Sequence, residues 1–221
     1  MRTSSALRSL AQGKPARADP AAVLGRFTAG ERAQGPPGEQ CELCAVPIGP
    51  QHPHVADVPD HRLLCACRPC YLLFSTTAAS RGRYRAVPET FRSYREFAMS
   101  AGQWDSLGIP VSLAFLYRQT DQDGWVAFYP SPGGATESLL DLTGWDEVVT
   151  ANPALAAVLP DVEAVLLRKV DDAFECYLVP IDACYELVGV VRQYWQGFSG
   201  GEEVWQQIDE FFAGVRERSG G

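Results

Sequence analysis

The alternation of hydrophobic and polar residues predicts two β-hairpins in the second half of the chain. Pro110–Arg118 and Trp125–Tyr129 are apolar and rich in residues that favour strands, and the turn-like segment Gln119–Gly124 separates them. The same pattern recurs at Val162–Val170 and Phe174–Val179, which two aspartates join. A further short strand is expected at 83–87. We therefore expect antiparallel strand pairs in this part of the chain.

Apolar residues that recur every three or four positions predict helices. Ile181–Trp195 follows this spacing. Ser199 and Glu202 have the spacing of a capping box in front of a last helix. The apolar stripe of that helix is Val204, Ile208, Phe211, Phe212 and Val215. Shorter helices are predicted over 90–99, 103–107, 143–150 and 153–160. Hairpins followed by helices, without regular βαβ alternation, indicate an α+β fold.

Composition divides the chain into three parts. Residues 1–38 are rich in Ala, Gly, Pro and Arg and have few apolar side chains, so we expect a disordered tail. Residues 39–80 hold five of the seven cysteines and all three histidines, which predicts a metal-binding module. Residues 81–221 contain the hairpins and helices and are expected to form a larger α+β domain with the module packed on it.

Two Cys-x-x-Cys pairs are the strongest chemical signal. Cys41 and Cys44 form the first pair, and Cys67 and Cys70 form the second, 22 residues further on. Two thiolates two residues apart in a tight turn can face one ion, and two such turns close four sulfurs around it. The spacing therefore predicts a four-cysteine metal site.

The sequence between the pairs fits a treble-clef or rubredoxin-like module. His52–Asp57 and Arg62–Cys65 can pair as a hairpin around the turn Val58–His61, and Tyr71–Ala79 is compatible with a helix. A knuckle, a hairpin and a helix that carries the second cysteine pair at its start form the treble-clef arrangement. A segment this short has a small core, so a bound ion would stabilise its fold.

Several alternatives remain open at this site. Cys65 can be a strand residue or an alternative ligand, and His52, His54 and His61 can also coordinate. A disulfide with free thiols is a further alternative, but no apolar stretch of secretory type occurs near the N-terminus. Zinc is the usual ion of a closed four-thiolate site, and a single iron uses the same ligands. We expect zinc, a cytoplasmic location and no insertion into a membrane.

Charge is distributed unevenly along the chain. The formal net charge is −8, but residues 62–95 carry +6 and residues 96–221 carry −14. The basic stretch at 81–95 also holds aromatic side chains, which is a pattern of nucleic-acid-binding surfaces. Because the acidic half would repel a polyanion, intramolecular pairing of the basic stretch is the simpler interpretation, and nucleic acid is not the expected partner.

A second candidate site is the Gly- and Pro-rich segment Tyr129–Ser138. Its glycines allow a close approach of backbone N–H groups, so the segment can bind an anion or a partner. The residues concerned are Ser131, Gly133, Gly134, Thr136 and Glu137. The alternative is an ordinary strand-to-helix turn with Thr136 as the helix cap. No histidine follows residue 61, so a Ser-His-Asp or Cys-His catalytic site is not expected, and we expect a protein without catalytic activity.

Several motifs together resemble a known family. They are C-E-L-C, H-x-H and L-L-C-A-C-R-P-C-Y-L-L-F within 41–74, G-R-Y-R at 82–85, F-Y-P-S-P-x-G-A-T-E-S-L-L-D at 128–141 and V-P-I-D-x-C-Y at 179–185. The chain resembles, over residues 40–213, an uncharacterised actinobacterial family whose genes tend to lie beside nickel–iron hydrogenase genes. The resemblance implies an accessory role in hydrogenase assembly or electron supply, with a hydrogenase subunit or maturation factor as partner. It implies no catalytic residues.

The sequence thus favours a zinc-stapled accessory or chaperone-like protein that binds a protein partner. Two other functions stay open at this point. One is a rubredoxin-like protein that transfers electrons through iron at the same four sulfurs. The other is a regulatory module that binds nucleic acid.

Overall fold

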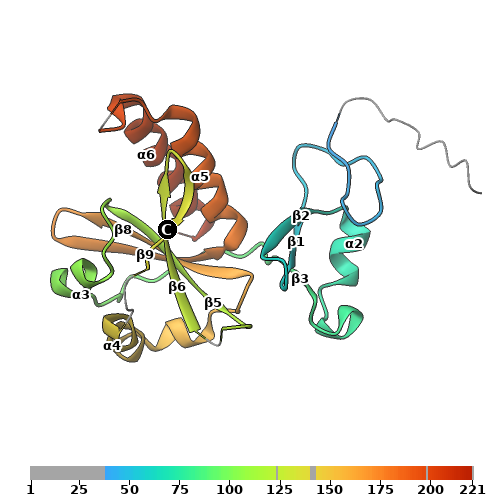
Figure 1. Cartoon of the computed structure of the whole chain (residues 1–221), viewed down its shortest axis with the longest axis horizontal. Coiled ribbons are helices and arrows are strands. Elements are labelled where there is room, and N and C mark those ends of the chain that lie inside the picture. Colours follow the sequence, from blue (N-terminus) through green and yellow to red (C-terminus); the bar gives the residue numbers. More distant parts are fainter. Residues whose placement is uncertain (1–37, 123, 140–142, 198, 221) are drawn as a thin grey trace, which may run out of the picture. The chain divides into compact units, whose positions relative to one another are not determined.

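A computed structural model describes residues 38–122, 124–139, 143–197 and 199–220 (Figure 1). Met1–Pro37 and Gly38–Gly221 form separate units, so the expected tail lies, apart from Gly38, outside the described residues. The second unit combines helices with antiparallel sheets, which confirms the predicted α+β class. Within the described residues, no helix is both long and apolar enough to cross a membrane.

A small three-stranded sheet follows the first cysteine pair. Strands β1 (His54–Asp57) and β2 (Arg62–Cys65) form the predicted hairpin, in which His54 lies opposite Cys65. The third strand, β3 (Tyr84–Ala86), pairs with the other edge of β1. The small sheet therefore continues beyond residue 80, at which the sequence analysis placed the end of the module.

Helix α2 (Arg68–Leu73) and the 3₁₀ helix η1 (Thr77–Ser80) complete this part of the chain. Pro69 lies in the first turn of α2, where its missing N–H has no intrahelical partner to lose. In this region Cys41, Val55 and Ala66 form a small buried cluster, while Ala56 of β1 and Val87 after β3 belong to a larger core. The small cluster by itself supplies little hydrophobic stabilisation.

A six-stranded sheet organises the larger part of the chain. Every neighbouring pair of its strands is antiparallel, and their order is β4-β9-β8-β5-β6-β7. The strands are β4 (Arg92–Ser93), β5 (Leu113–Gln119), β6 (Gly124–Ser131), β7 (Gly134–Glu137), β8 (Glu163–Val170) and β9 (Ala173–Pro180). The pairs β5–β6 and β8–β9 confirm the two hairpins that the sequence predicts.

Helices cover both faces of the six-stranded sheet (Figure 1). On one face lie α5 (Ile181–Tyr194) and α6 (Gly201–Arg218). On the other lie α3 (Ala101–Ser106), α4 (Thr143–Ala151) and the 3₁₀ helix η2 (Pro153–Ala157). Residues of β5 alternate between the two faces, which explains why its sequence is apolar throughout.

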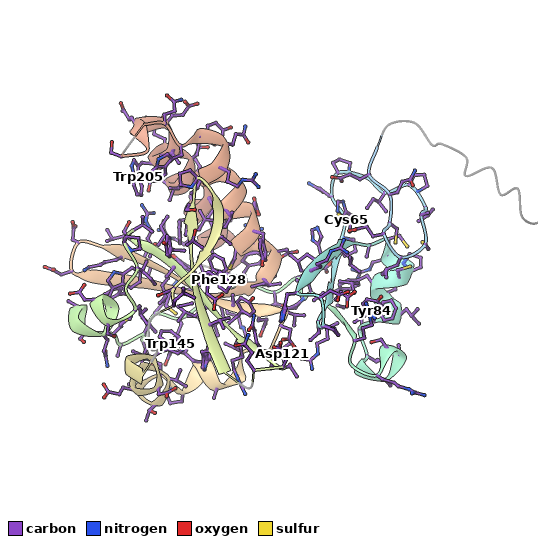
Figure 2. All side chains as sticks on the ribbon, in the orientation of Figure 1. Cys65, Tyr84, Asp121, Phe128, Trp145 and Trp205 are labelled. Atoms are coloured by element: carbon purple, nitrogen blue, oxygen red, sulfur yellow. The ribbon has the colours of Figure 1, made fainter. Side chains whose placement is uncertain are left out.

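Each face has its own hydrophobic core. The core under α5 and α6 includes the five residues of the predicted α6 stripe, all of them buried, and Phe128 packs against it (Figure 2). The core under α3 and α4 is centred on the fully buried Trp145 (Figure 2). The larger part of the chain is therefore a three-layer structure with the sheet in the middle.

The prediction of a helix over residues 90–99 is wrong. Arg92 and Ser93 instead form β4 and pair with β9. Further along, the buried Asn152 side chain accepts a hydrogen bond from the Ala98 N–H at 2.8 Å and donates one to the Ala98 carbonyl at 2.8 Å. These contacts with distant residues override the local preference of the segment for a helix.

Two expectations about turns are also wrong. Helix α6 begins at Gly201 with Gly200 as its N-cap, so Ser199 and Glu202 form no capping box. A capping box occurs instead at α3, between Ser100 and Gln103. The segment Tyr129–Ser138 does not lead from a strand into a helix with Thr136 as the cap, because it forms the β6–β7 hairpin.

Candidate metal centre

A tight turn presents the first cysteine pair. The Ala45 N–H donates to the Cys41 carbonyl at 2.7 Å, and the Cys41 N–H donates to the Val46 carbonyl at 2.9 Å. Ala45 has a positive φ of 61°, which lets the chain reverse directly after Cys44. The Glu42 N–H donates to the carbonyl of Cys65 at 2.9 Å, so the turn is attached to β2.

The second cysteine pair belongs to the start of α2. Cys67 is the N-cap residue, and its carbonyl accepts a hydrogen bond from the Tyr71 N–H at 2.9 Å. Cys70 follows three residues later, and positions three apart lie on the same side of a helix. The first turn of α2 therefore directs both sulfurs to one side.

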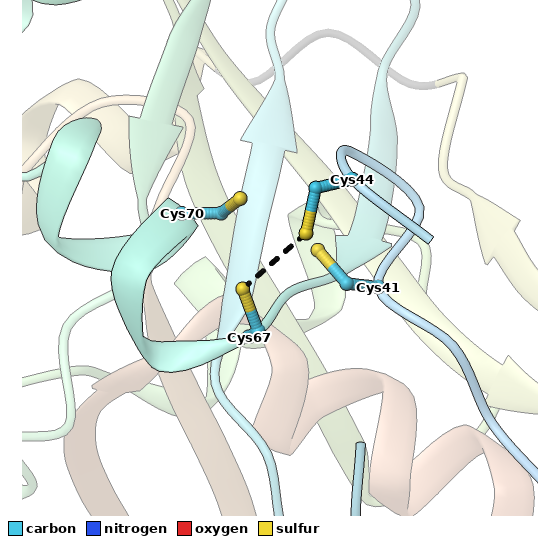
Figure 3. Close-up of side chains that lie close together, drawn as sticks. All are labelled: Cys41, Cys44, Cys67 and Cys70. Atoms are coloured by element: carbon cyan, nitrogen blue, oxygen red, sulfur yellow. Dashed lines mark hydrogen bonds between the residues drawn. The ribbon is translucent and has the colours of Figure 1, made fainter. Parts of the chain in front are cut away.

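The structure brings the four predicted cysteines together (Figure 3). The sulfurs of Cys41, Cys44, Cys67 and Cys70 all lie within 4.8 Å of one another. The Cys44 and Cys67 sulfurs are 3.6 Å apart. Four sulfurs at a typical Zn–S distance form a tetrahedron with edges of about 3.8 Å. The four side chains are thus close to the arrangement that a single ion requires.

The four thiols differ in their environment. Burial by itself raises the pKa of Cys41, but hydrogen bonds from backbone groups of Cys67, Leu43 and Cys44 outweigh it and lower that pKa from 9.0 to about 6. Burial and the neighbouring thiols raise the pKa of Cys70. Such a division is expected when several thiols share one space, because one thiolate disfavours the next.

The chemistry of the donors fits a metal better than a disulfide. All seven cysteines are free thiols, and 3.6 Å between sulfurs is far longer than a disulfide bond. Thiolates are soft ligands that suit Zn²⁺ and iron alike. The cluster can therefore bind a metal ion, and the four sulfurs do not by themselves select which one.

The alternative ligands of the sequence analysis lie elsewhere. His52, His54 and Cys65 form a second group whose ligand atoms lie within 4.8 Å of one another. His61 is paired with Asp121, with 3.2 Å between Nε2 and Oδ2. The spacing of the cysteines and histidines did not indicate the second group. The register of the predicted hairpin is the signal for it, because it places residue 54 opposite residue 65.

The candidate anion or partner loop is a two-residue turn between β6 and β7. The Gly133 N–H donates to the Ser131 hydroxyl at 3.2 Å, and that hydroxyl donates to the Gly134 carbonyl at 3.0 Å. The Thr136 hydroxyl is 2.9 Å from that of Ser131, and Glu137 ends β7. Binding of an anion or a partner by these residues stays a prediction.

Two arginines of the basic stretch pair with carboxylates of the acidic half, which is the kind of pairing expected from the sequence. Arg85 lies 3.0 Å from a carboxylate oxygen of Asp161, and Arg92 lies 3.0 Å from one of Glu163. Both acidic partners are almost fully buried and belong to the acidic half of the chain. These arginines therefore serve the fold.

A family model matches residues 40–219 of the chain. Its description is a family of unknown function, DUF5947. The chain belongs to the DUF5947 family. The match includes the whole four-cysteine cluster and the whole of α6. No curated protein and no solved structure matches the chain. Membership of DUF5947 therefore assigns no activity, and the functional argument depends on the site itself.

Proposed function

We propose that this DUF5947 protein is a metal-binding accessory protein without catalytic activity, in which one Zn²⁺ at Cys41, Cys44, Cys67 and Cys70 holds the N-terminal module together. The observation that carries this proposal is the convergence of the four sulfurs from two segments 22 residues apart. Zinc is the usual ion of a four-coordinate site made of protein ligands alone, and such sites are structural.

The energetic role of the ion follows from the size of the local core. The buried cluster beside the cysteines has three side chains, against more than twenty in the core under α5 and α6, so it provides little stabilisation to the cysteine turns and α2. The free energy of metal binding adds directly to the free energy of folding when the site is absent from the unfolded chain. The bound ion thus supplies folding free energy that the small buried cluster does not provide.

Partner binding is the second part of the proposal. Leu72 and Leu73 of α2 are 56% and 57% exposed, and Val46 beside the cysteine turn is 44% exposed. Exposed apolar side chains on a module that an ion makes rigid are suited to bind a protein partner. The resemblance to the hydrogenase-associated family suggests the partner, a nickel–iron hydrogenase subunit or maturation factor.

The metal part is tested on protein purified without chelators or an affinity tag. Native mass spectrometry and elemental analysis should find bound zinc, and Cys44→Ser should lose one ion per chain. Cys176→Ala is the matched control, because Cys176 is buried in the core under α3 and α4 and should leave the metal content unchanged. A red protein that contains iron at this site would favour a function in electron transfer over a structural zinc site. A Cys44→Ser variant that binds as much metal as the wild-type protein would refute the site.

The partner part needs a separate experiment. A pull-down with co-expressed hydrogenase subunits and maturation factors should retain one of them on the wild-type protein. Leu72→Asp with Leu73→Asp should abolish retention while the zinc content stays the same. Exposed Leu159 supplies a control, since Leu159→Asp lies outside the module and should leave retention intact. Absence of every hydrogenase protein from the wild-type eluate would refute this partner.

A further inference from the structure

A second group of metal-binding side chains lies outside the four-cysteine cluster. One ring nitrogen each of His52 and His54 and the sulfur of Cys65 lie within 4.8 Å of one another. His54 and Cys65 are opposite residues of β1 and β2, so their side chains share one face of the small sheet. His52 precedes His54 by two residues, which places it on the same face of an extended chain.

Hydrogen bonds leave the same nitrogen of each ring available. His52 Nδ1 lies 2.9 Å from the carbonyl oxygen of Gly49, and His54 Nδ1 lies 2.9 Å from Asp182 Oδ2. Both partners are acceptors, so in a neutral ring the proton sits on Nδ1 and the lone pair on Nε2. Each imidazole is therefore in the tautomer that binds a metal through Nε2.

His52 also has an unexplained buried polar atom. Its side chain is only 9% exposed, and its Nε2 has no hydrogen-bond partner among the described residues. A buried nitrogen without a partner costs free energy, so native structures rarely keep one without a reason. A cation held jointly with His54 and Cys65 satisfies this lone pair.

We propose that His52 Nε2, His54 Nε2 and the Cys65 thiolate form a second metal site, which takes one divalent transition-metal cation of the zinc type. Two imidazoles and a thiolate suit such a cation, whereas Mg²⁺ and Ca²⁺ prefer oxygen ligands. The Asp182 carboxylate on His54 and the Gly49 carbonyl on His52 are the outer partners that metal-binding histidines usually have.

The second site differs from the four-cysteine site in its coordination. Three protein ligands leave a fourth position to water or another small ligand, as in zinc sites that are not purely structural. A cavity of about 590 Å³ borders both histidines, and Asp182, Glu186 and Arg218 also line it. The cavity therefore lies beside the histidine side of the proposed site.

The test is a count of bound zinc in the full-length protein by native mass spectrometry, with Zn²⁺ alone as the added metal. The wild-type chain should bind two ions, and Cys65→Ser and His52→Ala should each bind one. His61→Ala is the matched control, because His61 belongs to neither cluster, and it should bind two. Cys65 is half-buried, and Cys65→Ser changes a single atom, so circular dichroism should confirm that this variant folds.

A conservative change of the outer partner gives an independent readout. Asp182→Asn removes the carboxylate from His54 and should weaken Zn²⁺ binding at the second site by about 10–100-fold, without changing the count at saturating metal. A Cys65→Ser variant that binds as many ions as the wild-type protein would overturn the proposal. The four-cysteine site is tested separately, because its failure is a Cys44→Ser variant that binds as many ions as the wild-type protein.

Discussion

Tyr117 on β5 illustrates how burial governs single side chains in this protein. It is 7% exposed, and its hydroxyl accepts a hydrogen bond from Gln119 Nε2 at 3.1 Å. Burial, with a smaller contribution from the nearby Tyr185, raises the pKa of Tyr117 from 10.0 to about 12. The phenolate is therefore much less stable in the folded than in the unfolded chain.

This shift predicts a loss of stability at high pH. The unfolded chain releases the Tyr117 proton near pH 10 and the folded chain near pH 12, so the contribution is complete below pH 10 and is lost as pH rises to 12. The expected loss by pH 12 is about 2 kcal/mol in the free energy of unfolding. Urea unfolding of wild-type and Tyr117→Phe proteins at several pH values measures it. A constant difference between the two proteins across this range would contradict the prediction.

The histidines show how much the identity of a neighbour matters at this scale. His54 and His61 are seven residues apart in the chain, yet His54 contacts Asp182 and lies opposite Cys65, while His61 pairs with Asp121. From the sequence alone, all three histidines are alternative ligands of one ion. Only their neighbours in space distinguish a member of a cluster from a surface residue.

At the scale of elements, the start of α6 depends on backbone freedom. Gly200 has a φ of 90°, and a Cβ there would lie 2.9 Å from Val204 Cγ1 and 3.1 Å from the ring of Trp195. At Gly214, in the interior of α6, an added Cβ would meet no atom within 4 Å. The conformation and contacts at the N-cap thus require Gly200, whereas no contact requires a glycine at position 214.

Alanine substitutions at these glycines should have opposite effects. Gly200→Ala combines an unfavourable φ with close contacts and should lower the free energy of unfolding by about 1–3 kcal/mol. Gly214→Ala should raise it by about 0.5–1 kcal/mol, because alanine restricts the unfolded chain and favours helix. Thermal and urea unfolding of both variants measure the changes. Equal effects of the two substitutions would show that the Gly200 conformation is not required.

Prediction of elements from the sequence succeeded where the local pattern was strong. Apolar residues at every second position predicted the β5–β6 and β8–β9 hairpins. Apolar residues at every third or fourth position predicted the helices α5 and α6. It failed over 90–99, because two residues of that segment pair with β9 and the buried Asn152 binds Ala98. Long-range contacts of this kind leave no periodic trace in the segment itself.

At the scale of the whole molecule, the described chain has cores of very different size. The small core around Cys41, Val55 and Ala66 lies among the cysteine turns, while two large cores enclose the six-stranded sheet. Because the small core is where the proposed Zn²⁺ contributes to folding, the two parts should respond differently to loss of metal.

Removal of metal by a strong chelator should therefore unfold the module first. Limited proteolysis should then cut within residues 39–87, whereas residues 91–221 should resist as they do in the untreated protein. Mass spectrometry of the fragments locates the cuts, and added Zn²⁺ should restore resistance. If chelator leaves residues 39–87 as resistant as before, the ion has no stapling role.

The sequence by itself determined the spacing of the four cysteines, the hairpin between them and the alternating and helical patterns of the larger part. Each of these depends on residues close together in the chain, and local geometry fixes where their side chains point. Only the tertiary structure decided that β3 and β4 join their sheets, and that Asp182 reaches His54 across 128 positions. Such contacts depend on how distant surfaces fit together, and this fit is a property of the packed chain as a whole.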